Sequence, residues 1–150
     1  MTSTGAHRNW LIVTAVIIAA FGPVFFLGTM ESTSESARLT LDLLSWPIDQ
    51  AQTYEDETLR FLSALTGGFL LGWGVMILCL RAWVYDAAPD GVRKSVVVGV
   101  LAWFLLDSLG SITSGNPSNA LFNVVVLLVA VGPLWRPARS SAPAPAGTAP

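Results

Sequence analysis

The sequence predicts an all-α, polytopic membrane protein: a bundle of four transmembrane helices with an acidic extracytoplasmic segment. Hydrophobic residues make up 53% of the 150-residue chain and charged residues only 12%, about half the charge of an ordinary soluble domain. Four long apolar stretches alternate with polar connections. Seven of the ten acidic residues fall in one connection, 31–58, whereas six of the eight basic residues lie beside the opposite helix ends. Lipid is therefore the predicted solvent of most of the chain.

The first predicted helix, 10–29, contains twenty residues and no charge. At about 1.5 Å per residue it spans roughly 30 Å, the thickness of the hydrocarbon core of a bilayer. It exceeds the apolar region of about 7–15 residues in a signal peptide, which favours a retained anchor. Gly22 and Pro23 predict a kink, because proline removes one backbone hydrogen bond. Ala15, Ala19 and Gly22 form a face on which another helix could pack.

The pattern of residues in the acidic connection, 31–58, predicts a short amphipathic helix. Ser32 and Glu35 have the spacing of a capping box, and apolar residues then recur at helical spacing. We expect this helix to lie at the membrane surface and to end near Trp46 and Pro47, since tryptophan collects at the level of the lipid headgroups.

The second predicted helix, 60–80, is rich in small residues. Thr53 and the acids after it predict its N-terminal cap. Ala64, Gly68 and Gly72 repeat every four positions, which predicts close packing on another helix, because small residues let helix backbones approach in lipid. A second row of small residues lies beside the first: Ser63, Gly67 and Gly74. Two such rows predict packing on both sides of this helix, within the molecule rather than between two copies.

The loop 81–94 separates the second helix from the third, which is predicted at 95–112. This loop contains Pro-Asp-Gly, a composition typical of turns. The polar and small residues of the third helix fall on one stripe, and Asp107 lies in that stripe. A short polar turn leads to the fourth helix, 119–135, with Asn123 one turn inside it. Asp107 is therefore predicted to point into the bundle and away from lipid.

Asp107 is the strongest candidate for a functional residue, because a carboxyl group within a membrane is costly and is a functional-site hypothesis by default. Counted at about 1.5 Å per residue, Asp107 and Asn123 lie at matching depths below the same membrane surface. The predicted intramembrane polar site consists of four residues: Asp107, Asn123, Arg60 and Ser111. A structural hydrogen bond to Asn123 is the favoured role of Asp107, and transfer of a proton or cation is the alternative.

The basic residues set the predicted orientation, since cytoplasmic loops of membrane proteins are enriched in lysine and arginine. Four crossings place the tail 1–9, the loop 81–94 and the tail 136–150 on one side, which predicts that both termini are cytoplasmic. His7 is expected to be solvated in the first tail. The last tail is rich in proline, alanine and serine and is expected to be disordered. The predicted location is a bacterial inner membrane.

Motifs of the common enzyme classes are absent from the sequence. It has no GxxxxGK[ST] loop, no GxGxxG, no CxxC pair and no HExxH. Its only histidine, His7, lies in the tail before the first predicted helix, so no Ser-His-Asp triad is expected. Cys79 is its only cysteine, so no disulfide within the chain can form. We therefore expect no catalytic residues, no cofactor and no metal site. No basic patch with interleaved aromatic residues indicates nucleic-acid binding.

The chain resembles small bacterial four-helix membrane proteins of unknown function in three features. These are a glycine-rich run, 60–74, that begins with a basic residue, a basic loop after it, and the sequence Trp-Phe-Leu-Leu-Asp-Ser-Leu-Gly at 103–110. The resemblance covers most of 10–135 and implies the architecture alone. Some proteins of this kind carry the label of the DNA-repair excinuclease ABC. That activity implies paired nucleotide-binding motifs and zinc-binding cysteines, and this chain has neither.

The sequence thus favours a non-catalytic structural or accessory component of a membrane over a transporter or channel component that uses Asp107 as a proton or cation site. Its predicted partner is the lipid bilayer. A second copy of the chain or another membrane protein remains open as a further partner.

Overall fold

The computed structural model describes residues 3–138, and the regular elements of this part of the chain are all helical. Its five α-helices are α1 (Thr4–Leu27), α2 (Glu35–Leu44), α3 (Glu57–Cys79), α4 (Pro89–Thr113) and α5 (Pro117–Val131). Three short turns complete them: 3₁₀ turns η1 (Glu31–Thr33) and η3 (Gly132–Trp135), and a π-helical turn, η2 (Leu80–Val84). Four helices are long and apolar enough to cross a membrane, and the predicted all-α class is confirmed. The η2 turn extends α3, and η3 extends α5.

All four long helices begin before the predicted residues; α5 starts at Pro117, two residues before position 119. Ser3 caps α1, its hydroxyl accepting a hydrogen bond from the amide of Ala6 at 3.1 Å, so that α1 starts six residues before position 10. Pro89 is the first residue of α4, within the predicted loop 81–94, because proline at this position sacrifices no helical hydrogen bond. Asp56, rather than Thr53, caps α3 by accepting from the amide of Leu59 at 2.9 Å.

The predicted capping box of α2 is wrong. Ser34 precedes the first helical residue, Glu35, and its hydroxyl makes no capping bond to the helix. Instead it donates to the carbonyl oxygen of Glu31 at 3.0 Å, within η1. The amphipathic helix itself is present, and it ends at Leu44, two residues before Trp46.

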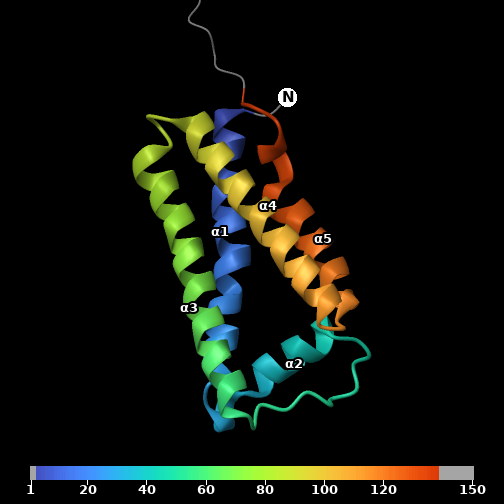
Figure 1. The fold of residues 1–150 in the computed structure, drawn as a ribbon. Coiled ribbons are helices and arrows are strands. Elements are labelled where there is room, and N and C mark those ends of the chain that lie inside the picture. The colour runs from blue at the N-terminus through green and yellow to red at the C-terminus, as the bar shows by residue number, and fades with distance from the viewer. Residues whose placement is uncertain (1–2, 139–150) are drawn as a thin grey trace, which may run out of the picture.

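The long helices form two pairs, α1 with α3 and α4 with α5, and the ends of the described chain lie together (Figure 1). The connection between α3 and α4 lies at this same end, and α2 lies across the opposite end (Figure 1). The guanidinium of Arg8 pairs with Asp86 at 3.0 Å, and that of Arg81 donates to the carbonyl oxygen of Arg8 at 2.8 Å. The basic residues that predicted the orientation therefore gather at one end of the bundle, except Arg139, which lies outside the described residues.

An apolar core closes this basic end. It joins residues from the N-terminal halves of α1 and α4 and from the C-terminal ends of α3 and α5, among them Leu11, Ile77, Val100, Val131 and Leu134. Their side chains are almost completely buried. The two helix pairs thus contact each other through apolar packing near the chain ends.

His7 belongs to this end of the bundle and not to a solvated tail, which corrects the prediction. Its side chain is 1% exposed, and Nε2 lies 3.1 Å from the carbonyl oxygen of Pro133. Arg93 donates to the neighbouring carbonyl oxygen of Leu134 at 3.0 Å. Carbonyl groups at a helix C-terminus lack partners within the helix, and these two side chains supply them for η3. The contact could not be predicted from the sequence, because a single histidine in a polar stretch does not indicate which distant residue it will contact.

The prediction that α3 packs on both sides is wrong for the row formed by Ala64, Gly68 and Gly72. A Cβ atom added at Gly68 or Gly72 would meet no atom within 4 Å, and both residues are exposed. Ala64, the third member of that row, is only partly buried. Because α3 packs along its length on α1 alone, only one of its two rows can lie in a close interface.

The row that does pack contains Gly67 and Gly74. A Cβ atom at Gly74 would lie 2.6 Å from the Cβ of Ala19, and one at Gly67 would lie 2.8 Å from the carbonyl oxygen of Gly22. Ala15 and Ala19 of α1 form the facing surface, as their spacing predicted. Close approach of the two backbones thus holds α1 to α3.

Candidate functional site

Asp107 of α4 lies at the centre of a polar cluster between α4 and α5. Its Oδ2 accepts hydrogen bonds from the side-chain amides of Asn119, at 3.1 Å, and Asn123. The amide of Asn119 also donates to Ser111 Oγ at 2.7 Å, and that hydroxyl donates to the backbone carbonyl oxygen of Asp107 at 2.7 Å. Asn123 has a second acceptor in Ser108 Oγ at 3.3 Å. The predicted contact between Asp107 and Asn123 is therefore present, with Ser111 beside it.

Arg60 does not belong to this cluster. It lies in the first turn of α3, where its positive charge helps to lower the pKa of Asp56, after the larger effect of the hydrogen bond from the Leu59 amide. No hydrogen bond or ion pair within residues 3–138 joins Arg60 to Asp107. The reason is the pairing of the helices: α3 follows α1, whereas Asp107 faces α5.

A tight turn between α4 and α5 brings the cluster together. Gly115 has a φ of 84°, a conformation that glycine adopts without steric penalty. Asp107 precedes the end of α4 by six residues, and Asn123 follows the start of α5 by six. At about 1.5 Å per residue both lie roughly 9 Å from the turn. Asn119 precedes Asn123 by four residues, so the i, i+4 spacing on one helix face was the signal that could have identified it.

Two cavities adjoin the cluster. The first, of about 550 Å³, lies between α2, the end of α4 and the turn before α5. The second, of about 330 Å³, lies among all four long helices. Five residues line both cavities: Leu41, Leu44, Trp103, Asp107 and Asn119. Asp107 therefore stands where the two cavities meet.

The linings of the two cavities differ in chemistry. Ser45, Gln52, Ser114 and Asn116 give the first cavity a polar wall. The second is largely apolar and aromatic, and its aromatic residues are Phe21, Phe25, Tyr54, Trp73, Trp103 and Phe122. Some of these rings are in contact with each other across helices: Phe21 meets Phe122 edge-on, and Trp73 meets Trp103 at a tilt, each pair with ring centroids 6.5 Å apart.

Asp107 is the one carboxylate among the residues that line these cavities, and those residues include no lysine, arginine or histidine. Within the described chain, its Oδ1 accepts no hydrogen bond. The positive charge that would balance an ionised Asp107 is thus missing from its surroundings.

Tyr54 supplies a neutral hydroxyl to the second cavity. The hydroxyl of Ser63 donates to the carbonyl oxygen of Phe25 at 2.9 Å, and Tyr54 Oη lies 3.1 Å from the oxygen of Ser63. Burial raises the pKa of Tyr54 above its ordinary value. The phenol is therefore uncharged at neutral pH and does not compete with Asp107 for a cation.

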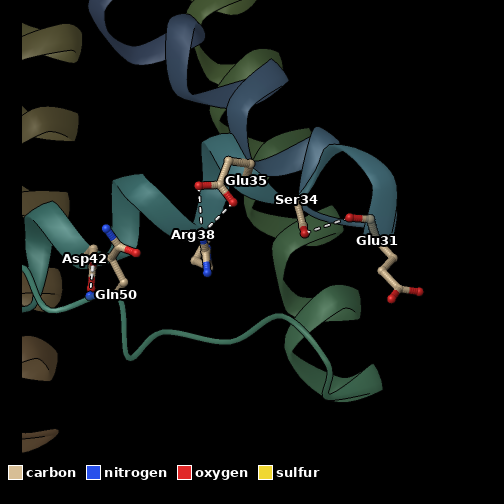
Figure 2. A network of polar contacts seen from close by, with 6 residues as sticks. All are labelled: Glu31, Ser34, Glu35, Arg38, Asp42 and Gln50. Carbon is tan, nitrogen blue, oxygen red and sulfur yellow. Dashed lines mark hydrogen bonds and ion pairs between the residues drawn. The ribbon is translucent and has the colours of Figure 1, made fainter.

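Contacts within and around α2 hold the outer wall of the first cavity. Figure 2 shows Arg38 paired with Glu35, at 2.7 Å, and Asp42 accepting from the backbone amide of Gln50 at 2.8 Å. Asp42 is 1% exposed, so this bond fastens the chain after α2 back onto the helix. Ser118, at the start of α5, donates to the carbonyl oxygen of Leu44 at 2.6 Å. The end of α2 is thereby fixed beside the cluster.

No further constellation of reactive groups is present among residues 3–138: no three His, Cys, Asp or Glu side chains there lie close enough to bind one metal ion. Comparison with known proteins gave no match to a protein-family model, to a curated protein or to a solved structure. The function of the chain must therefore be inferred from its own geometry.

Proposed function

We propose that this protein is a small, non-catalytic structural or accessory component of a bacterial inner membrane. Its large apolar side chains support insertion into lipid: Phe69, Trp83 and Leu106 are 76%, 80% and 75% exposed. A soluble protein rarely exposes apolar surface on this scale. The four long helices match the span of a bilayer in length and composition.

The position of the apolar core is the observation that favours an accessory role over transport. The polar cluster and both cavities lie toward α2, whereas Leu11, Ile77 and Leu134 fill the bundle near the chain ends. A path for an ion needs polar groups or water over the whole membrane thickness, and transporters provide them as chains of ionisable and polar side chains. In this bundle the polar groups and cavities are confined to the end beside α2, and apolar side chains pack at the other end.

Transport of a proton or cation through Asp107 is the second candidate, and the contact of Asp107 with both cavities favours it. Purified protein reconstituted into lipid vesicles distinguishes the two. We expect proton and potassium flux equal to that of protein-free vesicles, and equal flux for wild type and Asp107→Asn. Flux that appears with the wild-type protein and disappears with Asp107→Asn would replace the accessory role by transport.

The proposed orientation places both termini and the connection between α3 and α4 in the cytoplasm, with α2 outside. Ala51 lies in the connection between α2 and α3 and Ala87 in that between α3 and α4, and both are exposed. These two connections lie at opposite ends of the bundle (Figure 1), which makes the two alanines a matched pair for labelling. In a Cys79→Ala background, we expect an impermeant thiol reagent to label Ala51→Cys in intact cells. Ala87→Cys should react only after permeabilisation. The opposite pattern would reverse the orientation, and labelling of both in intact cells would contradict a membrane crossing by α3, the one long helix between these two positions.

A further inference from the structure

We propose that the paired cavities bind an organic ammonium ion with an apolar group, its positive charge at Asp107 and its apolar part among the aromatic rings of the second cavity. This inference goes beyond the accessory role, and the two are separable: the bundle can insert and support a membrane assembly without holding a ligand. It rests on charge, lining and volume.

Charge selects a cation. Asp107 lines both cavities, its Oδ1 accepts no hydrogen bond within residues 3–138, and the residues that line the cavities offer no basic side chain to balance its charge. Asp107 is partly buried and its Oδ2 accepts two neutral amide donors, so a ligand that adds a charge-assisted contact is favoured over a neutral one. An anionic ligand would meet repulsion from Asp107 and no compensating base.

The lining selects an organic cation over a metal ion. Ca²⁺ takes six to eight oxygen ligands, usually with several carboxylates, and Mg²⁺ requires octahedral coordination. Here a single carboxylate faces the cavities, and Asn119 and Asn123 turn their N–H groups, not their amide oxygens, toward it. Trp103 lines both cavities beside Asp107, and the face of an aromatic ring attracts a cation.

Volume and polarity fit an amphiphile. The two cavities have volumes of about 550 and 330 Å³, each within the usual range of about 300–1,000 Å³ for a small-molecule site. The cavity beside α2 has the larger share of polar side chains in a mixed lining, whereas the inner one is more strongly apolar and is lined by Phe21, Trp73 and Phe122. The ammonium group would thus bind at the junction while its apolar group fills the inner cavity. Both a free amphiphilic amine and a lipid with an ammonium headgroup have this chemistry.

The test uses 4-phenylbutylammonium and protein purified in a maltoside detergent, which has no charge. The probe should quench the tryptophan fluorescence of the wild-type protein in a saturable way, since Trp73 and Trp103 line the site. 4-Phenylbutanol and 4-phenylbutyrate have the same ring and chain without the positive charge. Each should bind with an affinity lower by about tenfold or more, because a charge-assisted contact is lost.

Variants assign the effect to the site. Asp107→Asn should weaken 4-phenylbutylammonium binding by about tenfold or more, since the amide keeps its shape but loses the charge. Asp49→Asn is the matched control: Asp49 is an exposed acid at the same end of the molecule and lines neither cavity. It should bind like the wild type. An unchanged melting temperature for Asp107→Asn ensures that lost binding does not reflect lost folding.

Lipid nanodiscs distinguish the two sources of the ammonium group. If a lipid headgroup occupies the site, 4-phenylbutylammonium should bind more weakly in discs of phosphatidylethanolamine than in discs of phosphatidylglycerol, for the wild type but not for Asp107→Asn. An affinity that varies equally for both proteins assigns the site to a free amine. Saturable binding that is the same for the alcohol and the ammonium ion, or the same for wild type and Asp107→Asn, would overturn the proposal, as would the absence of saturable binding.

Discussion

Gly74→Ala is expected to destabilise the bundle, whereas Gly72→Ala, two residues away on the same helix, is not. The new Cβ at position 74 would lie 2.6 Å from the Cβ of Ala19 and 2.7 Å from the carbonyl oxygen of Ala15. These contacts can be relieved only by moving α1 away from α3. Overpacking of this kind typically destabilises by about 1–3 kcal/mol. Thermal unfolding in detergent measures the change as a lower melting temperature.

For the control, Gly72→Ala, we expect no decrease in the melting temperature. A Cβ at position 72 meets nothing within 4 Å, and alanine is the better helix former by about 1 kcal/mol at most. Gly72→Ala should therefore keep or raise the melting temperature. Equal destabilisation by both substitutions would show that α3 packs closely on both sides, as its two rows of small residues first suggested.

Asp107→Leu is expected to destabilise the pair formed by α4 and α5, and Asp107→Asn to be tolerated. Leucine removes one of the two acceptors of each of the Asn119 and Asn123 amides, which leaves one N–H of each without a partner, and Asn123 is 2% exposed. A buried donor left without its acceptor costs about 1–3 kcal/mol. In Asp107→Asn the side-chain carbonyl oxygen can accept the same two bonds, so the change in stability should stay within about 1 kcal/mol.

The measurement is again thermal unfolding in detergent, with Leu105→Ala as a control for substitution on α4. Leu105 is 66% exposed on the outer side of the bundle, so its truncation opens no interior cavity. Comparable melting temperatures for Asp107→Leu and wild type would show that the polar cluster contributes nothing to helix association. Asp107 would then have no structural role, and ligand binding or ion transport would have to explain a carboxylate in this bundle.

Both experiments depend on the same property of the molecule, its division into two helix pairs. Gly67 and Gly74 hold α1 to α3 by close backbone approach, and Asp107 with the two asparagines links α4 to α5. Between the pairs lie the apolar core at one end and the cavities at the other. The outer wall of the first cavity, formed by α2, is held in place by the hydrogen bond from Ser118 and by the chain after α2.

The sequence by itself determined the number and identity of the membrane-length helices, because a run of about twenty apolar residues has few other stable conformations. It also determined the gathering of basic residues at one end, which follows from four successive helices that run in alternating directions. The contact of Asp107 with Asn123 was predictable as well, since a short turn places residues equally distant from it at the same depth. These features depend on local composition and on distances along the chain.

Only the tertiary structure decided which face of each helix is covered. The two rows of small residues on α3 are equivalent in sequence, and the choice of Gly67 and Gly74 over Gly68 and Gly72 depends on where α1 lies. Arg60 is excluded from the site for the same reason, because α3 pairs with α1 and not with α4. The burial of His7 depends on contact with Pro133, far along the chain. Periodicity specifies the faces that a helix possesses, whereas the contacts between distant segments specify the neighbour that covers each of them.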